Sequence, residues 1–299
     1  MDKEVHSIEI PVPKQFSFKE CYSFLNRGYN ECLFHVSNDE VSRAIRIKNK
    51  VILIKVSASN SSLLIDYHQT SNSEVNHQDI EHYLIDWFDL NRDISTFYEA
   101  LRSNSITKLF PKKYFGLRLI GIVDLFEALC WCVIGQQINL TFAHKVKSRL
   151  VHRFGDFIEN QGMKYYCFPT PDKIIQAKDE ELAEMQFSRQ KISYLKNIAE
   201  AFISHNISKE DLLKLSSKNQ IKKLTEIKGV GPWTANYASM KCLRNMNCIA
   251  YGDTGLSSAL LKHFGTDKKP SYEVIDEIFS EFKGWESYLN FYLWRSLSA

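Results

Sequence analysis

A single acidic residue, Asp253, stands between Gly252 and Gly255 at the expected start of a helix. Aspartate is a favourable N-cap residue, because its side chain accepts a hydrogen bond from the N–H groups of the first helical turn. The positive end of the helix dipole also favours the ionised carboxylate. Such a carboxylate can stabilise developing positive charge in a substrate or activate a water molecule. Asp253 is therefore the candidate catalytic group, and helix capping alone is the alternative.

A glycine-rich turn, Gly229-Val230-Gly231-Pro232, lies upstream of Asp253 and predicts a hairpin between two helices. Glycine permits the tight exit from a helix over residues 222–227, and proline suits the first turn of the next helix. Free N–H groups at that helix start form a site for an anion such as phosphate. A plain helical corner is the alternative. The predicted phosphate ligands are the backbone amides of Lys228, Gly229, Val230 and Gly231, together with Thr234.

Both segments resemble parts of the helix-hairpin-helix DNA glycosylases, a superfamily that pairs such a hairpin with a glycine- and proline-rich loop and an aspartate. The similarity is greatest to its bacterial 3-methyladenine DNA glycosylase II branch, the AlkA-like branch. Matching segments occur in the same order at residues 121–127 (GIVDLFE), 134–137 (IGQQ), 167–171 (CFPTP) and 284–288 (GWESY). The resemblance is clear from about residue 117 onward and weaker before it.

The resemblance implies a monofunctional glycosylase that hydrolyses the bond between deoxyribose C1′ and an alkylated purine, chiefly 3-methyladenine or 7-methylguanine, in double-stranded DNA. By its place after the hairpin, Asp253 matches the catalytic aspartate of the family. Its carboxylate would stabilise the positively charged sugar and steer a water molecule. Glycoside hydrolases normally need a second carboxylic acid to protonate the leaving group. An N-alkylated purine already carries positive charge, so one aspartate is sufficient.

Aromatic residues near the two motifs match positions that line the base pocket of the family: Trp233, Tyr237 and Trp285. An electron-rich ring attracts a cationic base through stacking and cation–π contact. The alternative is that these rings belong to the helical core. Lyase members of the superfamily carry a Schiff-base lysine where this chain has Trp233. The resemblance therefore implies an enzyme that leaves an abasic site and does not cut the strand.

The loop at Gln136, Gln137 and Ile138 matches the family's wedge, which fills the gap left by a flipped nucleotide. Gln137 is the wedge by position, whereas Ile138 is the better apolar plug. A polar loop cap is the alternative for this segment. The expected partner is double-stranded DNA containing damaged bases, bound by a monomer. No cofactor is expected, apart from a structural monovalent cation that the family often holds through hairpin carbonyls.

Composition sets wide limits on the class of protein. The chain has 299 residues, 44% hydrophobic content and a formal charge of +3, which neither requires nor excludes nucleic acid. Its seven cysteines form no CxxC pair, and its histidines show no HExxH spacing, so no zinc or iron–sulfur centre is expected. The odd cysteine number and the lack of a signal peptide favour reduced thiols in the cytoplasm. No apolar run has transmembrane length.

The predicted fold is α+β, with a small antiparallel-sheet domain over residues 1–88 and an all-α, two-lobed helix-hairpin-helix glycosylase core over residues 89–299, its hairpin at 224–244. Strands are expected at 44–47, 51–56 and 63–67, with a turn at Asn49-Lys50. Residues 16–26 favour a short helix. Apolar residues at helical spacing predict a second helix that packs on the sheet, namely Ile80, Tyr83, Leu84, Trp87 and Phe88.

Two other functions are consistent with the same motifs. One is a helix-hairpin-helix glycosylase for another lesion, such as hypoxanthine, ethenoadenine or oxidised guanine. The other is a non-catalytic helix-hairpin-helix protein that only binds DNA. Asp253 argues against the second, because binding alone does not need a carboxylate beside DNA phosphates, which repel it.

Overall fold

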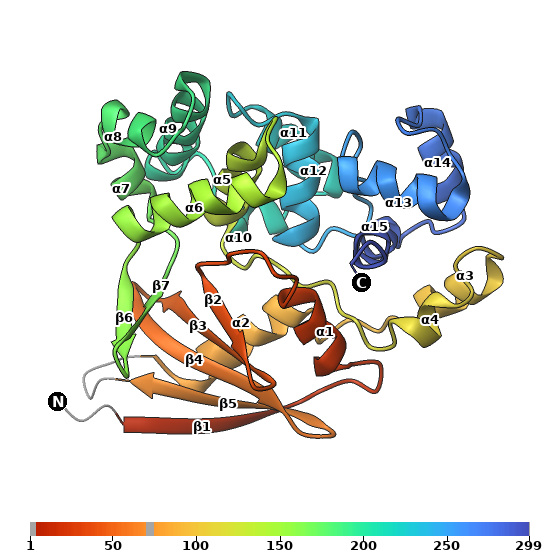
Figure 1. Cartoon of the computed structure of the whole chain (residues 1–299), viewed down its shortest axis with the longest axis horizontal. Coiled ribbons are helices and arrows are strands. Elements are labelled where there is room, and N and C mark those ends of the chain that lie inside the picture. Colours follow the sequence, from red (N-terminus) through yellow and green to blue (C-terminus); the bar gives the residue numbers. More distant parts are fainter. Residues whose placement is uncertain (1–3, 70–74, 299) are drawn as a thin grey trace.

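An antiparallel sheet followed by many helices forms this protein, as the computed structural model of residues 4–69 and 75–298 shows (Figure 1). The five strands lie in the order β1-β5-β4-β3-β2. Their bounds are β1 (Glu4–Pro11), β2 (Phe34–Ser37), β3 (Glu40–Ile47), β4 (Lys50–Ala58) and β5 (Ser62–Gln69). The predicted fold class, a small antiparallel sheet domain before a helical core, is confirmed.

The turn between β3 and β4 lies one residue earlier than predicted. Ile47 pairs with Lys50, so the two turn residues are Lys48 and Asn49, with φ angles of 48° and 64°. Positive φ at both positions is what a tight two-residue hairpin requires. The sequence did not predict β1 or β2. Both are edge strands that bury few side chains, so their hydrophobic alternation is weak.

Two helices accompany the sheet, α1 (Phe18–Leu25) and α2 (His77–Phe88). Asn76 caps α2, and it exchanges hydrogen bonds with Asp79 in a capping box. The predicted apolar stripe of α2 is confirmed, since four of its members are buried and pack into the same core as the strands: Ile80, Leu84, Trp87 and Phe88.

Thirteen further helices follow within the described residues: α3 (Ser95–Ser103), α4 (Phe110–Lys113), α5 (Leu125–Gly135), α6 (Leu140–Phe154), α7 (Pro171–Gln176), α8 (Asp179–Glu184), α9 (Arg189–Ile203), α10 (Lys209–Leu213), α11 (Ser217–Thr225), α12 (Pro232–Lys241), α13 (Thr254–Phe264), α14 (Tyr272–Ser280) and α15 (Glu286–Arg295). None of these described helices combines the length and the apolar content that crossing a bilayer needs. The predicted hairpin is confirmed as α11 and α12, with proline at the first position of α12.

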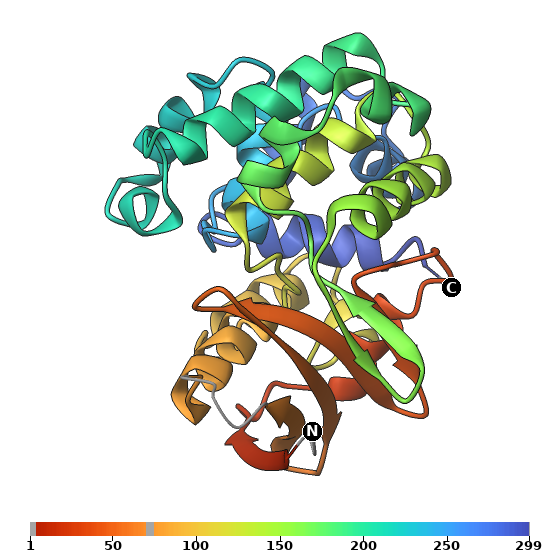
Figure 2. The ribbon, with the colours of Figure 1, turned by 90° about the vertical axis from the view of Figure 1, so that its left-hand side faces the viewer.

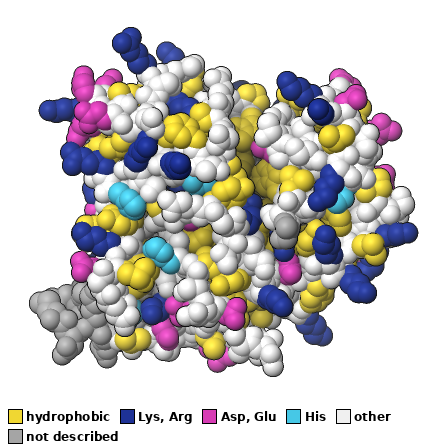
Figure 3. All heavy atoms as spheres, viewed as in Figure 1, with side chains coloured by type: hydrophobic (Ala, Val, Ile, Leu, Met, Phe, Trp, Pro, Cys, Tyr) yellow, Lys and Arg dark blue, Asp and Glu magenta, His cyan; other side chains and the backbone are white. Residues whose placement is uncertain are grey.

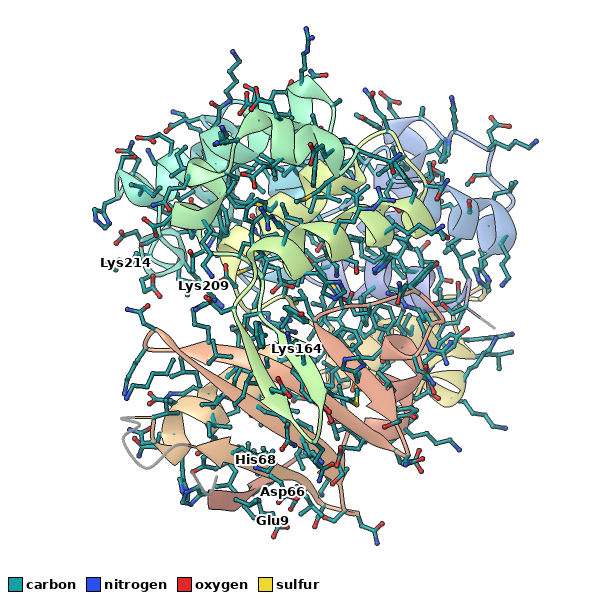
Figure 4. All side chains as sticks on the ribbon, turned by 60° about the vertical axis from the view of Figure 1, so that its left-hand side comes forward. Glu9, Asp66, His68, Lys164, Lys209 and Lys214 are labelled. Atoms are coloured by element: carbon teal, nitrogen blue, oxygen red, sulfur yellow. The ribbon has the colours of Figure 1, made fainter. Side chains whose placement is uncertain are left out.

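The helical part also contains one unpredicted two-stranded hairpin, β6 (Phe157–Asn160) and β7 (Met163–Tyr166). It descends from the helices onto the five-stranded sheet, where β6 contacts β4 and β7 contacts β3 (Figure 2). A second link is Lys209, labelled in Figure 4, whose ammonium group donates to Asp86 on α2 and to the Val123 carbonyl. The sheet is therefore tied to the helical part at several places.

Two large hydrophobic cores and one small cluster, formed by Ala44, Leu53, Tyr165 and Cys167, hold the described residues together. The sheet core contains the inner face of the five strands and α2, but also residues of α3, α4 and α13–α15. Within it, the Phe24 ring of α1 lies 4.4 Å from the Phe291 ring of α15. The hairpin core is formed by residues of α5–α12. Helix α12 belongs to both, because Met240 packs in the sheet core whereas Ala235 and Ala238 pack in the hairpin core.

Candidate active site

Asp253 is the N-cap residue of α13, as its sequence context predicts. Its Oδ1 accepts a hydrogen bond from the N–H of Leu256 at 2.7 Å and another from Nε1–H of Trp294 at 2.8 Å. Both donors therefore hold the same oxygen, and Oδ2 accepts neither of these bonds. One oxygen of the carboxylate is thus fixed by groups of α13 and α15.

Burial sets the acidity of Asp253. It raises the pKa of this carboxyl above the ordinary value, although the N–H groups of Leu256 and Gly255 and the indole of Trp294 act in the opposite direction. The helix start thus favours ionisation, as the sequence predicts, but it does not outweigh desolvation. The carboxylate is consequently more basic than one in water.

Three aromatic rings form a row that ends at Asp253. The Trp233 and Tyr237 rings of α12 lie 5.6 Å apart, and the Tyr237 and Trp294 rings lie 5.9 Å apart. All three rings are half-buried. We call Trp233, Tyr237 and Trp294 the aromatic row. Two of its members were predicted from the sequence, and Trp294 was missed because no local spacing connects it with a residue 41 positions earlier.

Trp285, the third predicted pocket residue, is not part of this row. It is the N-cap residue of α15, and its ring packs 5.6 Å from Phe97 of α3 and 5.6 Å from Tyr288. These contacts place Trp285 against the sheet core, beside α3. Its role in base binding stays a prediction.

The hairpin between α11 and α12 needs glycine at its first turn position. Gly229 has a φ of +104°, and a Cβ atom there would overlap the ring of Tyr194 on α9. Lys228 and Gly231 are exposed, and the N–H groups of Gly229 and Gly231 have no acceptor among the described residues. Val230 is buried, and its N–H donates to the Ile227 carbonyl at 2.9 Å.

Thr234, also predicted to contact phosphate, is 1% exposed. Together with Val230 it therefore belongs to the packing of the hairpin. The groups of the hairpin that remain available to an anion are the backbone amides of Lys228, Gly229 and Gly231, with the free N–H of Trp233 in the first turn of α12.

The predicted wedge loop follows α5 and touches the hairpin. The side-chain amide of Gln136 donates to the Gly229 carbonyl at 3.5 Å. Gln137 is exposed and has a φ of 57°, so the backbone turns sharply at this residue. Ile138 is half-buried and packs against the hairpin core. Of the two proposed wedges, Gln137 is therefore the one whose side chain is free to reach a partner.

A buried ion pair anchors the loop after α1 to α6. The carboxylate of Glu31 accepts hydrogen bonds from Lys147 at 2.6 Å and from the N–H groups of Cys32 and Leu33 at 2.9 Å and 3.0 Å. Burial raises the pKa of Glu31, but the charge and hydrogen bond of Lys147 outweigh it and lower the value to about 2. His144 lies beside the pair and its ring stacks on Tyr29 at 5.0 Å.

The molecular surface is hollowed between the helices of the hairpin core and the pair α13 and α14. Figure 3 shows this hollow, with hydrophobic side chains along its walls. In the same view of the ribbon, α12 and α13 flank this region (Figure 1). Helix α12 carries Trp233 and Tyr237, and α13 begins directly after Asp253, so the two helices that flank the hollow are those of the candidate site.

Comparisons with known proteins agree with this arrangement. Residues 130–284 match the family described as HhH-GPD superfamily base excision DNA repair protein, and residues 12–129 match the N-terminal domain of 8-oxoguanine DNA glycosylase. The DNA-3-methyladenine glycosylase of Bacillus subtilis is 38% identical over 97% of each chain. The DNA-3-methyladenine glycosylase 2 of Escherichia coli is 25% identical over 57% of this chain and 62% of its own.

The fold also has a close counterpart among solved structures. The 3-methyladenine DNA glycosylase of Archaeoglobus fulgidus superimposes with a TM-score of 0.84 over 98% of this chain and 100% of its own, at 23% identity. The family match covers more than half of the chain, and the similarity to the Bacillus subtilis protein extends over nearly all of it. This chain is therefore a member of the HhH-GPD superfamily of base excision DNA repair proteins.

Proposed function

We propose that this protein is a monofunctional DNA glycosylase that releases alkylated purines, chiefly 3-methyladenine and 7-methylguanine, from double-stranded DNA. The observation that carries the proposal is the aromatic row beside the carboxylate of Asp253. Electron-rich rings attract a cationic base, and a carboxylate stabilises the positive charge that develops on the sugar. The names of the Bacillus subtilis and Escherichia coli relatives support the same substrate class.

The proposed reaction needs only groups of this chain and water. The damaged nucleotide leaves the duplex, and its base stacks on the aromatic row. As the C1′–N bond breaks, its electron pair goes to the base, which becomes neutral, and Asp253 stabilises the sugar cation. Water then bonds to C1′, and its proton passes to the carboxylate and on to solvent. The exposed hairpin amides would hold a DNA phosphate during these steps.

DNA is the proposed partner, and the proposed working form is a monomer. Exposed Gln137 would enter the space that the flipped nucleotide leaves. The expected monovalent cation would bind hairpin carbonyls, of which those of Lys228 and Gly229 accept hydrogen bonds from Asn197 and Gln136 at 3.2 Å and 3.5 Å. A carbonyl oxygen has a second lone pair that can still face a cation.

The first test is release of bases from methylated duplex DNA by the purified protein. Chromatography of the soluble fraction should detect free 3-methyladenine and 7-methylguanine above the amount that enzyme-free DNA loses. Duplexes with 8-oxoguanine, hypoxanthine or ethenoadenine belong in the same experiment, because residues 12–129 match a domain of 8-oxoguanine DNA glycosylase. If one of these bases is released and none is released from methylated DNA, that lesion is the substrate and the proposal of alkylated purines is wrong.

The second test concerns strand cleavage. A lyase needs an accessible lysine that attacks C1′ and forms a Schiff base. Trp233 occupies that position here, and Lys241 on the same helix is 5% exposed and donates to the Ile120 carbonyl. Sodium borohydride added during turnover should therefore trap no covalent protein–DNA adduct on a denaturing gel. An adduct that forms with lesion DNA would show that a lysine takes part in the reaction.

A further inference from the structure

We propose that Arg27 is a specificity-determining residue, whose guanidinium group donates hydrogen bonds to the base and favours 6-oxopurines over 6-aminopurines. The inference rests on the proposed function and adds to it a residue outside the motifs of the hairpin and Asp253. Arg27 directly follows Asn26, the C-cap residue of α1. The segment after α1 runs between the sheet and the helical part in both ribbon views (Figures 1 and 2).

Arg27 is half-buried and has no polar partner. Its Nε is buried without a hydrogen bond, and none of its nitrogens forms a hydrogen bond or ion pair with a described residue. The nearest carboxylate along the chain, Glu31, is paired with Lys147. Burying a cation without a counter-ion costs free energy, and the donors that it leaves unused are suited to a ligand.

Other arginines of this protein do not share this state. In the described part of the chain, all the other arginines that are buried or half-buried form a hydrogen bond or an ion pair, namely Arg43, Arg46, Arg92, Arg118, Arg244 and Arg295. Their role in the fold is therefore explained by their partners, whereas that of Arg27 is not.

The guanidinium of Arg27 stacks on α1 and its charge reaches the aromatic row. Its Cζ lies 3.8 Å from the centre of the Phe24 ring. Burial raises the pKa of the Tyr237 hydroxyl, whereas a hydrogen bond with Trp131 and the charge of Arg27 lower it. Burial also lowers the pKa of Arg27 itself, but an arginine side chain stays cationic in a protein. Arg27 thus brings a positive charge to the hydroxyl end of the middle ring of the row.

The groups around the Tyr237 hydroxyl are donors. A guanidinium has five N–H groups and no acceptor, and an indole has one N–H. Because the Trp131 indole can only donate, the oxygen of Tyr237 accepts that bond and its own proton is free for another acceptor. A base that stacks on the aromatic row with an edge towards this end must therefore offer acceptors.

The substituent at position 6 distinguishes the candidate purines. Guanine and hypoxanthine carry an oxygen there, which accepts hydrogen bonds, whereas adenine carries an amino group, which donates them. Arginine pairs readily with such an O6. Since 7-methylguanine and 3-methyladenine are both cations, repulsion by Arg27 affects both, and the hydrogen bond to O6 decides between them.

Arg27→Met tests the selection, because methionine keeps an unbranched apolar side chain beside Phe24 and removes the charge and the donors. Methylated duplex DNA contains both alkylated purines, so one single-turnover reaction gives both release rates. The ratio of 7-methylguanine to 3-methyladenine release should fall about 10- to 100-fold, the range expected for a lost hydrogen bond from a charged group. Arg102→Met, which changes an exposed arginine of α3, is the matched control and should keep the wild-type ratio.

The ratio of the two rates is insensitive to a folding defect, because inactive molecules lower both rates equally. If Arg27→Met loses both activities to the same extent, Arg27 only supports the structure and the proposal is wrong. A wild-type ratio at wild-type rates, or a higher ratio, would overturn it as well.

Binding of free bases keeps this inference separate from the proposed function. Quenching of tryptophan fluorescence can follow the binding of hypoxanthine and adenine, two neutral purines, whether or not the protein releases a base from DNA. Wild type should bind hypoxanthine more tightly than adenine, and Arg27→Met should lose this preference. That result would support Arg27 as the selecting residue even if methylated DNA yields no free base. If wild type shows no preference, including no binding of either base, the inference is overturned.

Discussion

Asp253→Asn should slow the release of 3-methyladenine by about three orders of magnitude, comparable to the loss of a preorganised charge at a reacting centre. Asparagine is as good an N-cap as aspartate, so α13 should still begin at the same residue. What is lost is the negative charge that faces the sugar cation. The measurement is a single-turnover rate on methylated duplex, next to a binding titration with the same DNA.

Duplex affinity should be equal or slightly higher in Asp253→Asn, because the removed carboxylate repels phosphate. A variant that binds DNA normally and releases no base would identify Asp253 as a catalytic group. Release at the wild-type rate would show that the catalytic charge comes from another residue. Loss of both binding and release would instead point to a folding defect, which circular dichroism at the same temperature would reveal.

The same variant should also gain stability at neutral pH. Burial raises the folded-state pKa of Asp253 above the ordinary value of 3.8, so ionisation of this group opposes folding. Asparagine avoids that penalty, and the free energy of unfolding in urea should therefore be higher for Asp253→Asn at pH 7. The difference should shrink as the pH falls through the folded-state pKa towards 3.8, because wild type is then protonated as well.

Glu31→Gln should destabilise the protein by about 3–5 kcal/mol, because it leaves the buried ammonium of Lys147 without its counter-ion. Lys147 is 5% exposed, and both oxygens of Glu31 accept its hydrogen bonds at 2.6 Å. Urea unfolding at pH 7 measures the loss. The double variant Glu31→Gln/Lys147→Met should recover most of it, since neither partner is then an isolated buried charge.

The effect of Glu31→Gln should depend on pH in a defined direction. The folded-state pKa of Glu31 is about 2, below the ordinary value of 4.5. Its ionisation therefore contributes stability that is present above pH 4.5 and is lost as the pH falls towards 2. The difference in free energy of unfolding between wild type and Glu31→Gln should disappear over that pH range. If this difference stays constant down to low pH, the pair stabilises the protein through packing and not through its charges.

Local signals in the sequence were sufficient to locate the hairpin and Asp253. Gly229 and Pro232 reveal the hairpin because a tight helix exit and a first-turn proline are decided by neighbouring residues. Asp253 was found in the same way, since a capping aspartate before a helix is a short pattern. The strand pair β3 and β4 was also predicted, although its turn proved to be one residue earlier.

Features that depend on distant contacts could not be read in this way. Trp285 and Trp294 lie on the same terminal segment, and nothing local decides which of the two rings neighbours Tyr237. The partner of Lys147 is 116 positions away, so its sequence context suggests only a surface charge. In edge strand β1 the alternation of apolar and polar residues is too weak to predict a strand. Its pairing with β5 depends on residues near position 65. Tertiary packing decides each of these three features, and a short stretch of sequence carries no information about it.

The shared sheet core has a consequence for synthesis on the ribosome, where the N-terminal residues emerge first. Phe24 cannot meet Phe291 until α15 has left the exit tunnel, because the two rings belong to opposite ends of the chain. The strands can pair earlier, but the apolar surface that packs against α13–α15 stays exposed to solvent until α15 has emerged. The nascent sheet therefore exposes an apolar, aggregation-prone surface until translation is nearly complete. A ribosome that stalls before residue 286 would present a substrate for chaperones, not a folded domain.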